Sequence, residues 1–313
     1  MAQPGEFSMT YDVVVYVSSV ANAVKHPRKV ACLESFAQGA KKLGCTVHTE
    51  YQNRYSPSKL AVILGWATPQ TQGGANVALR KQVIANQRTA GNHTMCIDAS
   101  CFKYTDDASR YLRYSIGGPY YDKACYANVN SGDQQWQRIK QDLKLELKPT
   151  QIKSSGHILI CMQRDGGFAM KNLNPLQWLD DKLQQIRDIS RLPIVIRPHP
   201  GAYRASDFVK YGRMKNISVC DPKKISLIHN LQGAYCAVFF NSSASVAAVL
   251  EGVPVFVDDV SAVTWAVSNH SINDLPKPLS FDRSQWIYDL AAAHWSDDDS
   301  AMGKIYQQFE PYL

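Results

Sequence analysis

The sequence predicts an α/β protein made of two Rossmann-like domains, each with a parallel sheet, that face each other across a cleft. Short runs rich in β-branched residues alternate with amphipathic helical segments along the chain. The runs are continuously apolar, as expected where helices cover both faces of a sheet. The alternation starts again after a polar segment with Pro and Gly, residues 148–156, which we interpret as a linker. We therefore expect an N-terminal domain over residues 9–150 and a C-terminal domain over residues 151–313, with the last helices as candidates to cross back.

In the first half, hydrophobic periodicity predicts four strands and three helices. Residues 99–133 are rich in Tyr, Asp and Gly and are expected to be irregular, and so long a loop in a compact domain is usually functional. The expected strands are Tyr11–Val17, Cys45–Thr49, Leu60–Trp66 and Thr94–Ile97, and the expected helices are Val30–Leu43, Ala75–Gln87 and Gln134–Leu147.

The second half repeats the alternation with five strands. The expected strands are His157–Met162, Pro193–Ile196, Ile217–Val219, Ala237–Phe240 and Pro254–Val257. The expected helices are Pro175–Ser190, Ile225–Asn230 and Ser245–Glu251, followed by two helical segments between Ser284 and Tyr312.

Composition excludes several classes of protein. Of the 313 residues, 45% are hydrophobic, yet no apolar run is long enough to cross a membrane, so we expect no membrane contact. Eight cysteines form no CxxC pair, which argues against a zinc ribbon and favours a reducing, cytoplasmic location. No acidic pair of the DxD kind follows a strand, and we expect no obligatory metal.

Positive charge is concentrated in the first half. Residues 1–150 carry 18 Lys and Arg against 11 Asp and Glu, whereas residues 151–313 carry 16 of each kind. Such asymmetry suggests that the N-terminal half meets a polyanion, although a solvated basic face explains it equally well.

Three strand-end loops of the second half carry side chains suited to bind an anion. The carboxyl ends of parallel strands share one edge of a sheet, where ligands of open α/β folds bind. Arg and backbone donors at such an edge suit a diphosphate, although Asn and Ser are also ordinary helix caps. The candidate donor-binding residues are Arg164 and Gly166 after the first strand, Arg197 and His199 in the motif RPHP, and Asn241, Ser242 and Ser243 in the turn before a helix.

The RPHP motif, followed some forty residues later by NSS, a helix and EGVPVF, resembles the donor-binding domain of GT-B glycosyltransferases. The resemblance is nearest to capsule-type transferases and to related bacteriophage enzymes. It covers residues 157–260 well and residues 11–150 only by architecture. It implies that the C-terminal domain binds a nucleotide-sugar, with a UDP-sugar favoured, and that the N-terminal domain binds the acceptor.

One position departs from that family. Where it often has an acidic residue that binds the nucleotide ribose, this chain has Ala247, and the carboxylate stands instead at Glu251. Glu251 is therefore either a ribose ligand or an exposed helix-end residue.

Transfer to a hydroxyl needs a general base near the acceptor. We expect Asp98, at the end of a strand, to act as the base, with His26 and Asp122 as the next candidates; a capping role for Asp98 is the alternative. Cationic and aromatic side chains of the long loop and of the helix after Gly73 and Gly74 are suited to bind phosphates and stack on a base, or simply to pack the loop. These acceptor candidates are Lys103, Arg110, Arg113, Tyr120, Tyr121, Arg80 and Lys81.

The leading hypothesis is a nucleotide-sugar-dependent glycosyltransferase. The basic N-terminal half favours DNA containing a 5-hydroxymethylated pyrimidine as the acceptor, with the enzyme encoded by a phage and active in the host cytoplasm. The alternatives are transfer to a polysaccharide or small metabolite, a non-catalytic DNA- or nucleotide-binding protein, and a sugar-nucleotide epimerase. The sequence does not predict the oligomeric state.

Overall fold

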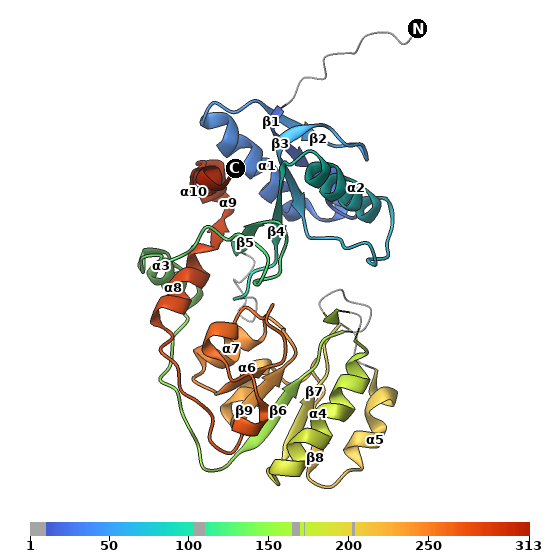
Figure 1. Cartoon of the computed structure of the whole chain (residues 1–313), viewed down its shortest axis with the longest axis vertical. Helices are drawn as coiled ribbons and strands as arrows, with labels where there is room; N and C mark the ends of the chain where they lie inside the picture. The colour runs from blue at the N-terminus through green and yellow to red at the C-terminus, as the bar shows by residue number, and fades with distance from the viewer. Residues whose placement is uncertain (1–10, 103–109, 165–169, 172, 202–203) are drawn as a thin grey trace.

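The computed structural model describes residues 11–102, 110–164, 170, 171, 173–201 and 204–313. The chain forms two α/β domains stacked along the long axis of the molecule (Figure 1). One domain is built on a six-stranded sheet and the other on a five-stranded sheet. The predicted α/β class and its two sheets with parallel strands are confirmed.

The N-terminal sheet has the strand order β11-β5-β4-β3-β1-β2. Its core is parallel, β5 pairs antiparallel with β4, and β11 pairs antiparallel with β5. The strands are β1 (Tyr11–Tyr16), β2 (Val47–Glu50), β3 (Ser58–Leu64), β4 (His93–Asp98), β5 (Tyr111–Ile116) and β11 (His294–Ser296). The helices nearest them in sequence are α1 (Pro27–Lys42), α2 (Ala75–Thr89) and α3 (Gln134–Leu143).

Alternate residues of β1 explain its unbroken apolar run. Val13 and Val15 pack in the cluster that holds Phe36 of α1, whereas Val14 and Tyr16 pack with Leu79 of α2. Because both faces of the sheet are covered, every position of the strand interior is apolar.

The C-terminal sheet is parallel throughout, with the order β10-β9-β6-β7-β8. Its strands are β6 (His157–Cys161), β7 (Ile194–Arg197), β8 (Ile217–Val219), β9 (Ala234–Phe239) and β10 (Val255–Val257). Its helices are α4 (Pro175–Ile189), α5 (Val209–Gly212), α6 (Leu227–Gln232) and α7 (Ser245–Leu250).

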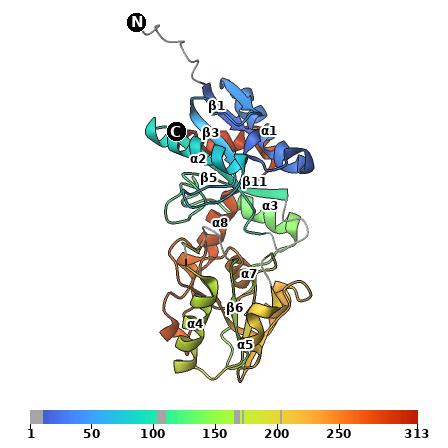
Figure 2. The ribbon, with the colours of Figure 1, turned by 90° about the vertical axis from the view of Figure 1, so that its right-hand side faces the viewer.

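The end of the chain returns to the N-terminal domain (Figure 2). After α8 (Ser284–Ala292), strand β11 pairs with β5, and Ile305 and Phe309 enter the core around α1. The last two helices are α9 (Asp297–Ala301) and α10 (Lys304–Phe309).

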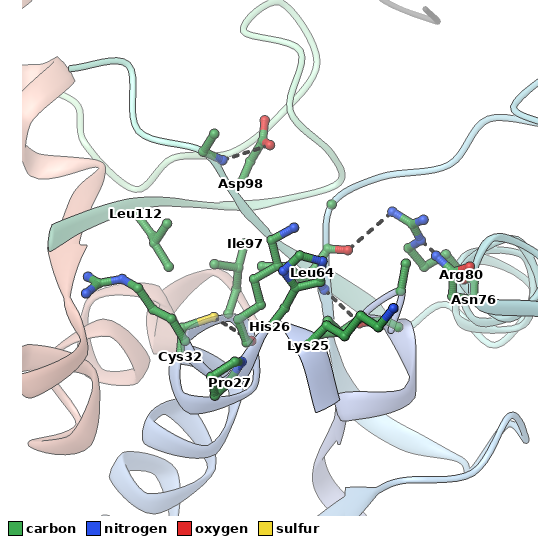
Figure 3. Close-up of a pocket in the computed structure, with 17 residues that line it drawn as sticks. Lys25, His26, Pro27, Cys32, Leu64, Asn76, Arg80, Ile97, Asp98 and Leu112 are labelled. Atoms are coloured by element: carbon green, nitrogen blue, oxygen red, sulfur yellow. Dashed lines mark hydrogen bonds between the residues drawn. The ribbon is translucent and has the colours of Figure 1, made fainter. Parts of the chain in front are cut away.

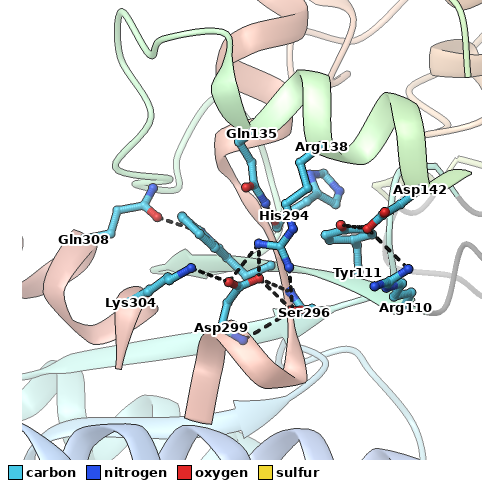
Figure 4. Close-up of polar contacts among 11 residues, drawn as sticks. Arg110, Tyr111, Gln135, Arg138, Asp142, His294, Ser296, Asp299, Lys304 and Gln308 are labelled. Atoms are coloured by element: carbon cyan, nitrogen blue, oxygen red, sulfur yellow. Dashed lines mark hydrogen bonds and ion pairs between the residues drawn. The ribbon is translucent and has the colours of Figure 1, made fainter. Parts of the chain in front are cut away.

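Asp299 anchors this returning segment (Figure 4). Its carboxylate is buried and lies 2.7 Å from Arg138 of α3 and 2.8 Å from Lys304, and it also completes a capping box with Ser296. Burial alone would raise the pKa of Asp299, but the Arg138 and Lys304 contacts hold that pKa well below its usual range.

The returning segment changes the distribution of charge. Residues 284–313 carry five acidic residues and one lysine. Counting them with the N-terminal domain lowers the surplus of residues 1–150 from seven positive charges to three, and residues 151–283 have a surplus of four. The asymmetry that suggested a polyanion therefore does not exist between the folded domains.

The main difference from the predicted elements is β5, which lies in the segment expected to be irregular. Tyr111, Tyr114 and Ile116 are buried in this strand, and its antiparallel partners on both sides supply its hydrogen bonds. Because β11 comes from 180 positions away, the pairing that makes this segment a strand has no local signal in the sequence.

Candidate functional site

A pocket of about 630 Å³ lies at the carboxyl edge of the N-terminal sheet (Figure 3). It is formed by the loop after β1, the first turns of α1, the ends of β3 and β4, and α2. Its polar or charged lining residues include Ser19, Lys25, His26, Arg28, Lys29, Asn76, Arg80 and Asp98.

Local hydrogen bonds hold the floor of the pocket. The Ser19 hydroxyl donates to the carbonyl of Tyr16 and accepts from the N–H of Leu64, at 2.7 and 3.0 Å, so that the loop after β1 is joined to the end of β3. Arg80 of α2 reaches the same place and donates to the carbonyl of Leu64 at 3.3 Å. The ends of two strands and one helix are thus fixed together.

Asp98 is the last residue of β4, and both of its carboxylate oxygens have a partner. Oδ1 accepts from the N–H of Ala99 at 2.8 Å and Oδ2 accepts from Nη2 of Arg113 at 2.7 Å. Arg113 is 8% exposed, and its guanidinium lies 5.6 Å from the ring centre of Tyr126. The buried charge of Arg113 orients Asp98 in this structure, and its role as an acceptor ligand stays a prediction.

His294 stabilises the loop after Asp98, and no sequence pattern marks this residue as functional. The imidazole is fully buried, with Nδ1 2.7 Å from the carbonyl of Leu290 and Nε2 accepting from the N–H of Cys101 at 3.0 Å. Burial lowers the pKa of His294 to about 3, so the ring is neutral and its two nitrogens keep fixed roles.

The pocket brings together three residues predicted from separate segments. Asp98 and His26, both candidate bases, and Arg80, a candidate acceptor ligand, all line it. Lys25 and Lys29, which are not among the predicted site residues, also line it. The signal was present, because the loop after the first strand reads VKHPRK.

Other acceptor candidates lie elsewhere. Asp122 is exposed in a turn, Lys81 donates to the carbonyl of Pro69, and Arg110 pairs with Asp142 at 3.3 Å beside α3 (Figure 4). Tyr121 stacks on Tyr126, with ring centres 4.7 Å apart, and its hydroxyl accepts from Asn128.

These placements leave four predicted roles untested. Asp122, Lys81, Arg110 and Tyr121 do not line the pocket, and the last three serve contacts within the protein. Tyr120 is half-buried, and burial raises its pKa to about 12 with a further contribution from Asp259 of the other domain. Lys103 lies outside the described residues.

The carboxyl edge of the C-terminal sheet carries a hydrogen-bonded set of polar side chains. Gln163, after β6, donates to Oδ1 of Asn241, after β9, at 2.9 Å. The side-chain amide of Asn241 in turn donates to the hydroxyl of Ser261 at 2.9 Å. Beside them, Lys171 forms a 2.8 Å ion pair with Asp259. Asn241 is thus at the centre of the edge, and Gln163 and Ser261 are additions to the predicted set.

The remaining polar residues of this edge differ in their exposure to solvent. Ser242 and Ser243 are half-exposed at the start of α7, and Arg164 is exposed after β6. His199 is half-exposed, and its Nδ1 accepts from the N–H of Gly201. Gly166 lies outside the described residues.

Arg197 is buried, and its guanidinium bonds within the protein. It is 8% exposed, and its Nη1 donates to the carbonyl of Ile225 and to Oδ1 of Asn230, both at 2.7 Å. Its guanidinium therefore joins the end of β7 to α6 and the loop before it. In this structure the protein occupies these donors, and the diphosphate-binding role of Arg197 stays a prediction.

Glu251 is also placed away from the strand edge. It lies at the end of α7 opposite to Ser242 and forms a 2.6 Å ion pair with Lys148 of the linker. In this structure Glu251 holds the linker, and its role as a ribose ligand stays a prediction.

The two carboxyl edges lie close to each other. Cys101 and Phe102, which follow Asp98, share one hydrophobic cluster with Val246 of α7, which follows Asn241. The segment after β4 and the helix after β9 therefore belong to one continuous hydrophobic core at the junction of the two domains, which Figure 1 shows between the sheets.

The part of the chain that the structure describes contains no group of metal ligands and no membrane-spanning helix. In that part of the chain no three His, Cys, Asp or Glu side chains gather as metal ligands would. None of the helices described there combines the length and apolar character needed to cross a bilayer.

Comparison with known proteins yields a fold and no family. No protein-family model and no curated protein sequence matches the chain. Among solved structures, Thermosulfurimonas dismutans KpsC, a beta Kdo 2,4 transferase, matches with a TM-score of 0.55 at 12% identity over 92% of this chain and 90% of that chain. The beta Kdo 2,7 transferase of KpsC from the same organism matches with a TM-score of 0.55 at 13% identity. The match covers 95% of this chain and 99% of that chain. The chain has the fold of these transferases.

Proposed function

We propose that the protein transfers a sugar from a nucleotide-sugar, bound at the carboxyl edge of the C-terminal sheet, to an acceptor held in the N-terminal pocket. The observation that carries the proposal is the position of Asp98. It is a fixed carboxylate in a pocket at one sheet edge, beside a second edge lined by hydrogen-bonding side chains. The fold shared with two Kdo transferases supports the same assignment.

Asp98 is the general base of this proposal. It accepts the proton of the acceptor hydroxyl as the oxygen attacks the anomeric carbon of the donor sugar. Each carboxylate oxygen has two lone pairs and uses one of them on Ala99 or Arg113, so each keeps a site for a substrate proton. Arg113 fixes the orientation of the carboxylate, and His294 holds the loop that follows it.

The proposed site for the nucleotide-sugar offers uncharged hydrogen-bond donors to the diphosphate. The side chains of Gln163, Asn241 and Ser261 and the hydroxyl groups of Ser242 and Ser243 lie at the ends of β6, β9 and β10. Preorganised donors of this kind stabilise the negative charge that develops on a leaving diphosphate. We favour a UDP-sugar from the resemblance of the RPHP and NSS segments, and the reaction needs no metal in this scheme.

The acceptor proposed from the sequence is a hydroxymethylated pyrimidine in DNA, and its support is reduced. It rested on a basic N-terminal half, and the returning segment removes most of that surplus. A saccharide or small metabolite fits a pocket of about 630 Å³, which lies within the usual range for small-molecule sites.

The test supplies a panel of labelled UDP-sugars together with hydroxymethylcytosine-containing DNA, unmodified DNA, neutral saccharides and acidic saccharides. Mass spectrometry measures transfer. The proposal expects transfer to one acceptor class that Asp98→Asn abolishes and the exposed-site control Asp122→Asn retains. Epimerisation of the donor without an acceptor, or binding of a nucleotide-sugar with no turnover on any acceptor, would contradict it.

A further inference from the structure

The N-terminal pocket is strongly basic. Its basic side chains come from three segments, namely the loop after β1, the first turn of α1, and α2, and comprise Lys25, His26, Arg28, Lys29 and Arg80. The single carboxylate among its described lining residues is Asp98, which is already paired with Arg113. The pocket therefore carries positive charge that the protein does not neutralise there.

Two of these cations have no partner in the described part of the chain. The ammonium groups of Lys25 and Lys29 form neither an ion pair nor a hydrogen bond with any described residue. Arg28 differs, because its charge acts on Asp297 of α9. Lys25 and Lys29 are thus available to a ligand.

Arg80 is held at the pocket in a half-buried position. Its Nε and Nη1 donate to the carbonyls of Asn76 and Leu64 at 3.2 and 3.3 Å, and its Nη2 has no partner among the described residues. Because the guanidinium is half-buried, water solvates it less than an exposed one, and this burial lowers the pKa of Arg80.

Gly65 makes room for Arg80. Its φ is 71°, a left-handed conformation, and a Cβ at this position would lie 2.8 Å from Nη1 of Arg80. The sequence thus keeps a glycine where any side chain would push the guanidinium aside.

The N-terminus of α1 adds to the same potential. This helix has 16 residues, and its first turn carries Arg28 and Lys29 with no acidic residue. Basic side chains at a helix N-terminus oppose the macrodipole, each by a few tenths to about 1 kcal/mol. An anion bound in the pocket would offset both the dipole and the unpaired cations.

We infer that the pocket binds an anionic group, a carboxylate or a phosphate, on the small acceptor molecule, and that Lys25, Lys29 and Arg80 hold this group while Asp98 meets the acceptor hydroxyl. That the bound molecule is an acceptor rests on the proposed function, whereas the anion site itself rests on the pocket and its charges. The acceptor class is therefore an acidic sugar or a sugar phosphate.

Isothermal titration calorimetry with four probes tests this inference: glucose 6-phosphate, glucuronate, inorganic phosphate and glucose. We expect one or both charged sugars to bind, more weakly as salt rises, and glucose to bind at least tenfold more weakly. Arg80→Ala and Lys29→Ala should each raise the Kd of the charged sugar about tenfold, as expected for loss of one charge-assisted contact. The two charged sugars distinguish phosphate from carboxylate.

The neighbouring Lys81→Ala is the matched control, because it removes a charge from α2 whose ammonium group turns away to Pro69. It should change the Kd less than twofold. Gly65→Ala keeps every charge but crowds Nη1 of Arg80, and it should weaken binding by less than Arg80→Ala does. Circular dichroism and thermal unfolding establish that each variant is folded.

Equal affinity for glucose and the charged sugars, no binding of either charged sugar, or an equal loss in Lys81→Ala and Arg80→Ala would overturn the inference. These outcomes are separate from the fate of the proposed function, since the titration contains no donor. Binding of charged sugars without consumption of any nucleotide-sugar would keep the anion site and reject the transferase. Transfer to neutral acceptors only would keep the transferase and reject the anion site.

Discussion

The carboxyl edges of the two sheets use their polar side chains in opposite ways. At the N-terminal edge, Lys25 and Lys29 line a preformed pocket without partners in the described part of the chain. At the C-terminal edge, Gln163, Asn241 and Ser261 bond to one another, and Arg197 is turned into the fold. A ligand of the first edge meets charge that is already exposed, whereas a ligand of the second must exchange hydrogen bonds with the protein.

The largest expected effect tests the chemistry at the N-terminal edge. Asp98→Asn should lower turnover by at least about a hundredfold, because the amide cannot accept the acceptor proton. The Kd for a nucleoside diphosphate should not change, since that ligand occupies the other edge. Steady-state kinetics and calorimetry measure the two quantities, and full turnover in this variant would remove Asp98 as the base.

Arg197→Ala tests whether the C-terminal edge is internally bonded. Truncation leaves Asn230 and the carbonyl of Ile225 without their buried donor, and should lower the free energy of unfolding by about 2–3 kcal/mol. Urea titration measures this loss. Arg164→Ala, which removes an exposed charge from the same edge, is the control and should leave stability unchanged. Unchanged stability with lost diphosphate binding in Arg197→Ala would restore the ligand role predicted from the RPHP motif.

A pH titration of stability tests the brace behind Asp98. His294 has a pKa of about 3 when folded, against about 6.5 in an unfolded chain, so only the unfolded chain binds its proton between these values. Stability should therefore fall with decreasing pH below 6.5, by about 1.4 kcal/mol per pH unit from this group.

The variant His294→Gln removes that contribution and should flatten the dependence between pH 6.5 and 4.5. His157 is half-buried and its pKa is also lowered by burial, so His157→Gln gives the contribution of a second histidine to the same window. An equally steep fall in His294→Gln would show that the ring is not the group that titrates.

The smallest effect concerns Glu251. Its ion pair with Lys148 is partly exposed, so Glu251→Gln should cost less than about 1 kcal/mol of stability. The affinity for UDP should remain the same, because the carboxylate lies at the far end of α7. An increase of about tenfold in the Kd for UDP, as expected for loss of a charged hydrogen bond, would place the ribose at Glu251 after all.

The sequence predicted the fold more fully than the sites. Both sheets follow from runs such as Ala234–Phe239, because burial on two faces requires apolar side chains at every position. Strand β11 could not be predicted, since its three residues become a strand only by pairing with β5. A strand-end position marks a residue such as Asp98 as a candidate. It does not reveal where the side chain turns, and the acceptors that bind Arg197 come from α6 and the loop before it, 33 and 28 positions later.

The distribution of charge between the folded domains could not be predicted from the sequence either. The first half of the chain has a surplus of positive charge, but the acidic residues that balance it lie in the last 30 positions of the chain. The unpaired cations of one pocket are more informative than that total, because they identify where an anion can bind.

A crystal structure of the protein with UDP bound would test the central assignment most directly. The proposed division of labour predicts the diphosphate within hydrogen-bonding distance of Asn241 and Ser242, with the Gln163–Asn241 bond exchanged for bonds to the ligand and the pocket at Asp98 left for the acceptor. A diphosphate held instead by Lys29 and Arg80 would contradict it.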